Sequence, residues 1–202
     1  GITECPTKVS LKNNLAASIQ GLNQSSSERF LQLAKKTLAA SIQSIDLSLY
    51  KRVALIVGTS FGARLDDPSA AEADLDAWGQ QLAEVSGIKQ VITLSTACSS
   101  GADVVYLAGM LIAAGEYDLC ICGGVDILSD AKRLAHTALG TLASGYLKPF
   151  DEARTGTVLG EGAGFLVLAR APINQQDIYA YYCGGGSAND GAGLTAPDAK
   201  AI

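Results

Sequence analysis

The sequence of 202 residues lacks the features that would place it in a membrane or in a secretory compartment. A membrane-spanning helix needs about 20 consecutive apolar residues, and the most apolar stretch, residues 102–114, is interrupted by Asp103 and Gly109. The first 14 residues are mostly polar and contain no apolar core of the kind that marks a secretion signal. We therefore expect a soluble, cytoplasmic protein with no membrane span.

Basic residues are also in short supply. The chain has 15 Lys and Arg residues against 20 Asp and Glu residues, a formal net charge of −5, and the basic residues are scattered. Binding to a phosphate backbone calls for a concentrated basic face, so nucleic acid is not expected as a partner. An acidic carrier protein could still dock on a small basic patch, although the sequence does not locate one.

Ligands for a metal ion are few, with one histidine and five cysteines at irregular spacing. The cysteines are Cys5, Cys98, Cys120, Cys122 and Cys183. An odd number of cysteines indicates reduced thiols. A structural zinc site needs about four ligands, which Cys120 and Cys122 cannot supply alone. We interpret this pair as two small buried residues on one face of a strand, and we expect no metal.

The apolar pattern predicts strands that alternate with helices, which is typical of the α/β class. The expected strands are residues 53–57, 91–94, 119–122, 165–168 and 178–182, and Gly123-Gly124 is expected to end the third. The expected helices are residues 25–42, 70–85, 99–114 and 130–142. The first helix opens on a capping box, Ser25-x-x-Glu28. Residues 1–24 stay unassigned, and residues 1–202 are treated as one domain.

Cys98 stands out because it lies where an expected strand turns into an expected helix. The segment reads VITLSTACSS, with small residues on both sides of the cysteine. The N-terminus of a helix carries unpaired N–H groups and a partial positive charge, which favour a thiolate. The N–H of Cys98 could also donate to an oxyanion. Spacing alone leaves two interpretations open, an activated nucleophile and a buried cysteine that merely packs.

Several segments together resemble the β-ketoacyl synthases, the ketosynthases of fatty acid and polyketide assembly. Thr96-Ala-Cys-Ser-Ser100 resembles their active-site motif. The segments that follow in the family's order are Gly123–Asp126, Lys148–Asp151, Gly156–Gly164, Asn189–Gly191 and Leu194–Pro197. The resemblance is strong from Val91 to Pro197 and weak before Lys51. It implies the N-terminal half of a thiolase-like fold, a layered mixed sheet flanked by helices.

The resemblance also implies a reaction and its partners. Cys98 would attack an acyl thioester on an acyl carrier protein and hold the acyl group. A malonyl thioester would then lose carbon dioxide, and its carbanion would attack the acyl-cysteine to give a β-ketoacyl thioester. The phosphopantetheine arm arrives on the carrier, so no diffusible cofactor is expected. A homodimer or a heterodimer with a ketosynthase-like chain is implied as well.

Other residues are placed by the same resemblance. Alignment without gaps from Cys98 puts Leu128 and Thr137 near positions that shape the family's acyl tunnel. The family also uses two histidines and a lysine from its C-terminal half, and that half has no counterpart in this sequence. His136 lies outside any family histidine motif, so we interpret it as a surface or packing residue. A reduced variant and a piece of a longer chain both stay open.

The glycine-rich segment Gly160–Gly164 leads into a strand rather than from a strand to a helix, so it does not fit a dinucleotide-binding loop. Its glycines are expected to permit close backbone approach near the site. Glu161 is expected to be a buried, hydrogen-bonded carboxylate rather than a general base.

Two other functions compete with a carrier-dependent ketosynthase. One is a non-catalytic subunit that binds the carrier or sets chain length beside a true ketosynthase. The intact Cys98 counts against it, because such partners in the family usually replace the nucleophile. The other is a thiolase-like enzyme that acts on coenzyme A thioesters. Lys148–Asp151 and Gly160–Gly164 favour the ketosynthases over this last class.

Overall fold

A computed structural model of the chain describes residues 1–5, 7, 9–23, 25–60, 62–66, 76–170 and 178–189. Parts of two predictions fall outside these ranges: residues 70–75 of an expected helix, and the family segments at residues 190–191 and 194–197. Within the described ranges, no helix is long and apolar enough to cross a membrane.

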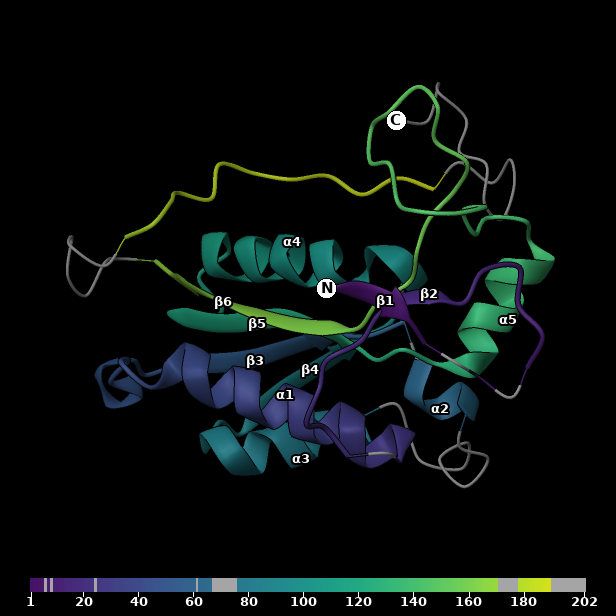
Figure 1. The fold of residues 1–202 in the computed structure, drawn as a ribbon. Coiled ribbons are helices and arrows are strands. Elements are labelled where there is room, and N and C mark those ends of the chain that lie inside the picture. Colours follow the sequence, from purple (N-terminus) through teal and green to yellow (C-terminus); the bar gives the residue numbers. More distant parts are fainter. Residues whose placement is uncertain are drawn as a thin grey trace.

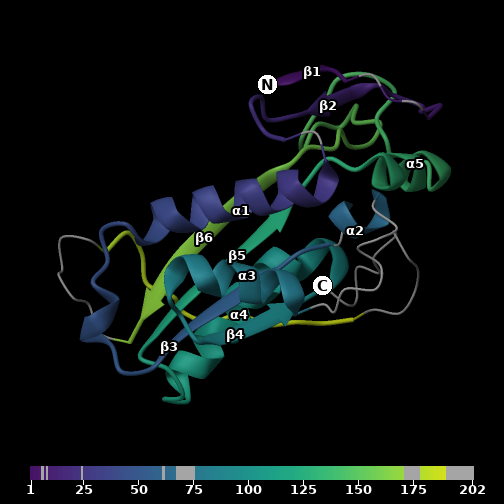
Figure 2. The same cartoon turned by 90° about the horizontal axis from the view of Figure 1, so that it is seen from below.

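A mixed sheet forms the centre of the protein (Figures 1 and 2). Its strands are β3 (Val53–Gly58), β4 (Gln90–Leu94), β5 (Leu119–Asp126) and β6 (Gly162–Ala169), in the order β4-β3-β5-β6. β3 is parallel to both of its neighbours, and β6 is antiparallel to β5. The central position of β3 explains its continuous apolar run, because both faces of the strand are covered. The mixed sheet confirms the expected α/β class.

β5 differs from its prediction because it does not end at Gly123-Gly124 but continues to Asp126. The glycines permit this continuation. A Cβ atom on Gly123 would lie 2.1 Å from the carbonyl oxygen of Gly164 on β6. Here glycine allows two antiparallel strands to approach, whereas the sequence pattern suggested a strand end.

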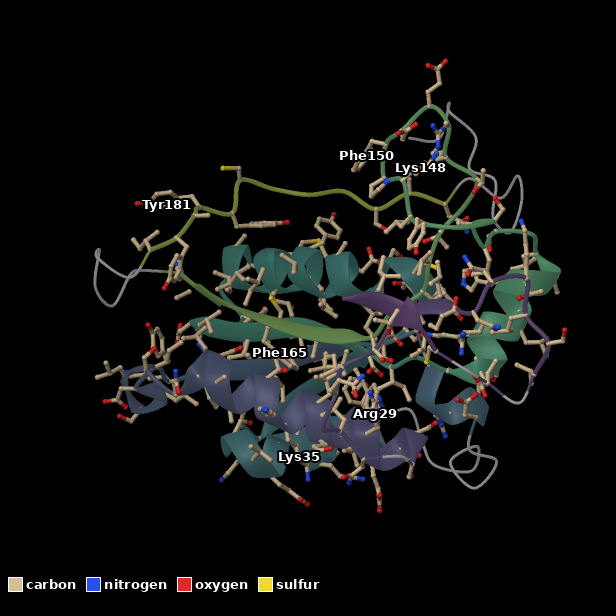
Figure 3. All side chains as sticks on the ribbon, in the orientation of Figure 1. Arg29, Lys35, Lys148, Phe150, Phe165 and Tyr181 are labelled. Atoms are coloured by element: carbon tan, nitrogen blue, oxygen red, sulfur yellow. The ribbon has the colours of Figure 1, made fainter. Side chains whose placement is uncertain are left out.

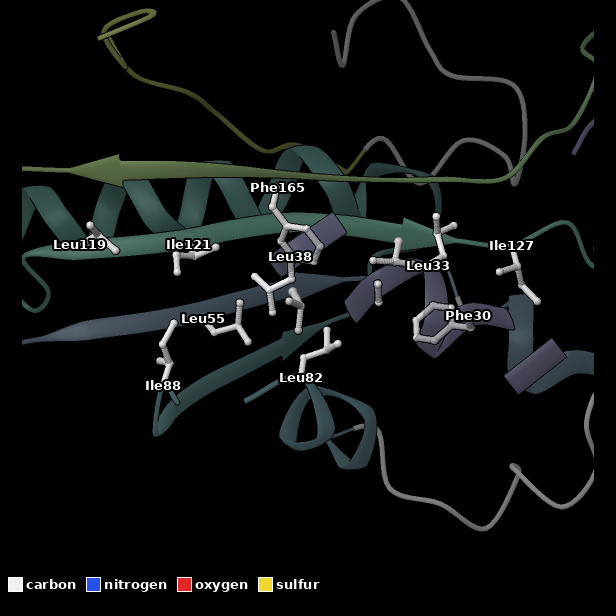
Figure 4. Close-up of a cluster of buried hydrophobic side chains, with 13 residues drawn as sticks. Phe30, Leu33, Leu38, Leu55, Leu82, Ile88, Leu119, Ile121, Ile127 and Phe165 are labelled. Atoms are coloured by element: carbon white, nitrogen blue, oxygen red, sulfur yellow. The ribbon is translucent and has the colours of Figure 1, made fainter. Parts of the chain in front are cut away.

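One face of the sheet packs against α1 (Ser26–Ile42) and α3 (Ala77–Ser86), and this side holds the larger hydrophobic core (Figure 4). Its largest members include Phe30, Leu38, Leu55, Leu82, Leu119, Ile121 and Phe165. The rings of Phe30 and Trp78 meet edge to face with centroids 5.2 Å apart, an arrangement that aromatic pairs prefer. The helices and the sheet are therefore joined by side chains from five separate elements, α1, β3, α3, β5 and β6.

The opposite face of the sheet packs against α4 (Ser100–Ala113), as Figure 1 shows. A second apolar cluster lies between them and consists of Ala54, Ile56, Val104, Ala108, Cys120 and Cys122. Burial raises the pKa of the Cys120 thiol to about 11 and that of the Cys122 thiol to about 12. The expectation that this cysteine pair is buried on one strand face is confirmed.

α4 matches its predicted bounds closely but is not buried all round, since Met110 is 43% exposed. Residues 178–182 form no strand and belong to an extended segment, residues 178–189, that runs along the outer side of α4 (Figure 1). A Cβ atom on Gly109 would lie 2.2 Å from the ring of Tyr182, so this ring sits directly against the helix. The extended segment therefore covers part of α4 without pairing with the sheet.

Two helix ends also differ from their predictions. The hydroxyl of Ser25 makes no capping hydrogen bond at the start of α1, so the expected capping box does not form. α5 (Asp130–Ala138) is shorter than expected because the chain turns at Gly140, whose φ is +69°. By contrast, Gly87 ends α3 as expected, with φ +71° and its N–H bonded to the carbonyl of Ala83.

Three of the remaining described elements, β1 (Ile2–Glu4), β2 (Leu15–Ala17) and α2 (Gly62–Asp66), lie around the edge of the sheet where β5 ends. The short helix η1 (Leu47–Leu49) lies at the opposite edge, between the end of α1 and the start of β3. β1 and β2 pair antiparallel. The buried Arg133 of α5 donates to the carbonyls of Cys5 and Asn14, which attaches this strand pair to α5.

The Lys148–Asp151 motif lies on a loop outside the sheet, with Phe150 fully exposed near its tip (Figure 3). Phe150 has a φ of +59°, which few residues other than glycine adopt. The base of the loop is held by hydrogen bonds between Ser144 and Thr155. The motif that resembles the family is thus presented on a closed and exposed loop.

Candidate active site at Cys98

The cysteine singled out by the sequence lies in a sharp turn between β4 and α4. A short 3-10 helix, η3 (Ala97–Ser99), follows the end of β4 and continues directly into α4. Cys98 is exposed to solvent. The strand-turn-helix prediction is confirmed, and the interpretation of Cys98 as a buried packing residue is wrong.

The backbone at this turn is strained. Ala97 has a φ of +56°, in the left-handed region that residues with a side chain rarely adopt. Holding a residue in such a conformation costs about 1–3 kcal/mol and persists only where surrounding contacts enforce it. The turn therefore depends on contacts that fix it, and two sets of hydrogen bonds supply them.

The inner set is made by Ser100, which is buried under the turn with 2% exposure. Its hydroxyl lies 2.7 Å from the carbonyl oxygen of Ala97 and 3.1 Å from that of Thr59, and it accepts the N–H of Thr96 at 2.9 Å. Because Thr59 directly follows β3, Ser100 joins the turn that carries Cys98 to the central strand. The sequence showed Ser100 only as a small neighbour of Cys98.

Two glycines allow the start of α4 to sit against the sheet. A Cβ atom on Gly58 would lie 2.7 Å from the carbonyl oxygen of Ser100, and one on Gly124 would lie 3.3 Å from the Cα atom of Gly101. Gly58 ends β3 and Gly124 lies in β5, so a glycine on each strand leaves room for the first residues of α4. The position of Cys98 thus depends on glycines that lie far from it in the sequence.

Replacing Gly58 with alanine tests this dependence. We expect Gly58→Ala to lower the free energy of unfolding by about 1–3 kcal/mol, because the added methyl group meets backbone rather than a flexible side chain. Chemical denaturation measures the change. Gly101→Ala is the matched control, because a Cβ atom there meets nothing within 4 Å. Equal losses in the two variants would contradict the close approach at Gly58.

A polar network ties the ends of β3 and β5 together beside the turn. Asp126 accepts hydrogen bonds from the N–H and hydroxyl of Ser60 and from the hydroxyl of Thr59. Lys132 on α5 lies 2.8 Å from the same carboxylate and also contacts the hydroxyl of Ser60. The network supports the segment to which Ser100 is bonded. The sequence contained Asp126 within a family motif but did not indicate these partners.

Leu128 lies on the same edge of the sheet as Cys98. β4 and β5 are both parallel to β3, so their carboxyl ends point the same way. Cys98 follows β4 and Leu128 follows β5. These two strands are separated by β3, so they lie about 10 Å apart at the usual spacing of neighbouring strands. Thr137 lies on α5, and its hydroxyl donates to the carbonyl of Arg133. An acyl-pocket role for Leu128 and Thr137 stays a prediction.

His136 and Glu161 have local structural partners. His136 lies in the last turn of α5, and its Nδ1 atom is 2.7 Å from the hydroxyl of Thr141, which follows the helix. Desolvation lowers the pKa of His136, and the nearby charge of Lys132 lowers it further. The Glu161 carboxylate is fully buried and pairs with Arg29 of α1, which is labelled in Figure 3. These contacts agree with the expected packing role of His136 and confirm Glu161 as a buried, hydrogen-bonded carboxylate.

Glu161 joins four parts of the chain. Besides Arg29, it accepts the N–H groups of Ile19 at 2.6 Å and Leu128 at 3.3 Å. Burial favours the neutral carboxyl group, but these donors outweigh it and hold the pKa of Glu161 below its usual range. Through the N–H of Leu128, Glu161 fixes the backbone that follows β5.

The glycines of Gly160–Gly164 do not make the close backbone approach near Cys98 that the sequence predicted. A Cβ atom on Gly160 would lie 3.0 Å from Ala17, so this glycine permits close approach to β2. Gly162 and Gly164 face open space. The expected close approach near the cysteine is therefore made by Gly58 and Gly124, and the prediction for Gly160–Gly164 is wrong in location.

A cavity lies between the first turn of α4 and the sheet. Its volume is about 380 Å³. It is lined by Gly101, Val105, Cys122, Gly123, Gly124, Gly164, Phe165 and Leu166. Within the described ranges, no group of three or more His, Cys, Asp or Glu side chains is arranged to hold a metal ion.

Comparison with solved structures identifies the fold. The ishigamide ketosynthase/chain length factor superposes with a TM-score of 0.68 at 22% identity, covering 83% of this chain and 50% of that one. A beta-ketoacyl synthase from Burkholderia phymatum superposes with a TM-score of 0.63 at 24% identity, covering 80% of this chain and 49% of that one. The chain therefore has the thiolase-like fold of a ketosynthase N-terminal half.

Sequence comparison places the region around Cys98 in a family. Residues 81–172 match the family model of the beta-ketoacyl synthase N-terminal domain. Polyketide synthase PksL from Bacillus subtilis is 33% identical over 72% of this chain, which spans 3% of that protein. The 3-oxoacyl-[acyl-carrier-protein] synthase 2 of Mycobacterium bovis is 34% identical over 54% of this chain, which corresponds to 28% of that protein. The chain thus spans only a small part of these relatives and about half of the two solved structures described above.

Proposed function

We propose that this chain is the N-terminal half of a ketosynthase and that Cys98 is its acyl-accepting nucleophile. The observation that carries the proposal is an exposed cysteine in a strained strand-to-helix turn, within the segment that matches the family. The pathway is fatty acid or polyketide synthesis, to which the named relatives belong.

The geometry of the turn supports the proposed acyl transfer. The Cys98 thiol gives up its proton as the sulfur attacks the carbonyl carbon of an acyl thioester and forms a new carbon–sulfur bond. Negative charge develops on the carbonyl oxygen, and the N–H of Cys98 is the donor proposed to stabilise it. The bond to the phosphopantetheine sulfur then breaks, and that thiolate takes up a proton. The acyl group remains on Cys98 and no diffusible cofactor is consumed.

The decarboxylative step needs groups that this chain does not supply in the family's arrangement. His136 lies on α5, where it is hydrogen-bonded to Thr141, and not at a strand end beside the cysteine. The proposal therefore assigns acyl holding to this chain, and decarboxylation and carbon–carbon bond formation to the complete site.

The proposed partners are an acyl carrier protein and a second ketosynthase-like chain. One structural relative is described as a type II acyl-carrier protein in complex with its ketosynthase, and another as a ketosynthase/chain length factor. Among the described strands none pairs with the outer side of β4, the edge of the sheet that leads to Cys98. An open edge can pair with a strand of another chain, which supports a homodimer or a heterodimer.

Mass spectrometry of acyl transfer tests the proposal. We expect an acyl thioester, presented on a carrier protein, to add one acyl mass to the full protein, on the peptide that contains Cys98. Cys183 is the internal control, because it is also exposed but lies on the extended segment along α4. Acylation that is absent, or that is equal at Cys183, would contradict the proposal.

The same assay separates the thiolase-like alternative. A ketosynthase that depends on a carrier should acylate Cys98 faster from a carrier-bound donor than from the matching coenzyme A thioester. A clear preference for the coenzyme A donor would instead favour a thiolase-like enzyme.

A further inference from the structure

Asp103 makes the outer set of hydrogen bonds at the nucleophile turn. It lies in the first turn of α4, and its Oδ2 atom accepts the hydroxyl of Thr96 at 2.5 Å and that of Ser99 at 2.7 Å. The two hydroxyls also lie 3.1 Å from each other. Thr96 and Ser99 stand on either side of Ala97 and Cys98, so one carboxylate joins both ends of the turn.

The same two hydrogen bonds favour the charged carboxylate. Those from Thr96 and Ser99 lower the pKa of Asp103, with Thr96 contributing most. Asp103 is therefore ionised at neutral pH, and bonds to an ionised acceptor are stronger than bonds between neutral groups.

From these contacts we infer that Asp103 is a positioning residue for Cys98, because it holds the turn at residues 96–99 by accepting the hydroxyls of Thr96 and Ser99. The inference rests on the proposed function of Cys98 only for its effect on acyl transfer. The structural part, that Asp103 holds the turn, depends on the contacts alone.

The left-handed backbone at Ala97 explains why the turn needs the contacts of Asp103. Ser100 holds the turn from the side of the sheet, but its bonds reach Thr96, Ala97 and Thr59 and leave Ser99 untouched. The hydrogen bond that Asp103 accepts from Ser99 fixes the residue that follows Cys98. The hydrogen bond that it accepts from Thr96 fixes the start of the turn. Without Asp103, the turn can relax away from the left-handed conformation at Ala97, and the Cys98 sulfur moves with it.

The chemistry of the acceptor predicts which substitution is tolerated. Asparagine keeps one side-chain oxygen with two lone pairs, which can accept both hydroxyls. Alanine removes this acceptor, which leaves the Ser99 hydroxyl with only the carbonyl and the hydroxyl of Thr96 as partners. Asp103→Asn should therefore preserve the turn although it removes the charge, and Asp103→Ala should release it.

Hydrogen exchange and acyl transfer, measured on the full protein, test the inference together. We expect Asp103→Ala to speed amide exchange in peptides that cover residues 96–100 and to slow acylation of Cys98 by about 10- to 100-fold, because small displacements of a reacting group have effects of this size. Asp103→Asn should stay within about threefold of wild type in both measurements. Asp46→Ala is the matched control, because Asp46 is another exposed carboxylate that accepts a serine hydroxyl, at the start of η1.

The outcomes separate this inference from the proposed function. Unchanged exchange at residues 96–100 in Asp103→Ala would overturn it, and so would an equal loss in Asp103→Asn. A wild-type protein that shows no acylation would overturn the proposed function instead, while the exchange data would still decide whether Asp103 holds the turn.

Discussion

Replacing Cys98 with alanine is expected to abolish acyl transfer to the protein while leaving its fold intact. The thiol is exposed, and the contacts that hold the turn come from Ser100 and Asp103 rather than from the sulfur. Surface substitutions of this kind usually change the free energy of unfolding by less than about 0.5 kcal/mol. Loss of the nucleophile should reduce the rate of condensation by at least about 1,000-fold, because no other group can form the covalent intermediate.

The measurement is condensation by the complete assembly, with thermal unfolding recorded in parallel. Cys183→Ala serves as the control, since it removes the other well-exposed thiol from the α4 side of the molecule. Full activity in Cys98→Ala would favour the competing function, a non-catalytic subunit that binds the carrier or sets chain length. Loss of activity accompanied by unfolding would contradict the claim that the sulfur has no structural role.

Removing Arg29 is expected to produce the largest loss of stability of any single charge change considered for this protein. The Glu161 carboxylate has no exposed surface and Arg29 is 15% exposed, so Arg29→Ala leaves a buried charge without its partner. Breaking a buried pair from one side typically costs about 3–5 kcal/mol. The exposed pair between Arg52 and Asp118 is the matched control, with exposures of 50% and 29%, and Arg52→Ala should cost less than about 1 kcal/mol.

The pH dependence of stability should change direction in the same variant. In the wild-type protein the pKa of Glu161 lies below its usual range. Its contribution to stability is therefore complete above the unfolded-state pKa of about 4.3 and is lost as the pH falls through the lower folded-state value. In Arg29→Ala, burial without the cation should raise the pKa of Glu161. Stability should then increase as the pH falls from about 7 to about 5.

Chemical denaturation at several pH values measures both effects. The double variant Arg29→Ala/Glu161→Gln provides a further check, because it removes the buried charge together with its partner. It should recover part of the loss and should show no increase in stability at lower pH. A pH profile of Arg29→Ala that keeps the wild-type slope would contradict the assignment to Glu161.

The turn that carries Cys98 could be predicted because the sequence pattern that indicates it is local. A strand, a run of small residues and a helix follow one another within Val91–Ala113, and the structure keeps this order. The contacts that support the turn could not be predicted in the same way. Gly58 and Thr59 are about 40 positions from Ser100, and nothing in their own segment indicates that a helix start packs against them.

Other differences have the same physical origin. Gly123-Gly124 indicated a strand end because glycine weakens an isolated strand, but here the missing side chains let β6 approach. Residues 178–182 are apolar and aromatic enough for a strand, yet they lie along α4 and have no strand partner. The capping box at Ser25 has the required residue types without the hydrogen bond. Each case turns on a partner that is distant in sequence.

The strand order has a consequence for the chain as it leaves the ribosome. β3 ends at Gly58, but its two partners in the sheet are residues 90–94 and 119–126, and β6 follows only at residue 162. An apolar strand is thus synthesised before either of its strand partners exists. Pairings between such distant segments form slowly and leave apolar surface exposed meanwhile. We therefore expect nascent chains that stop before β5 to aggregate or to bind chaperones, and chains that extend past β6 to do so much less.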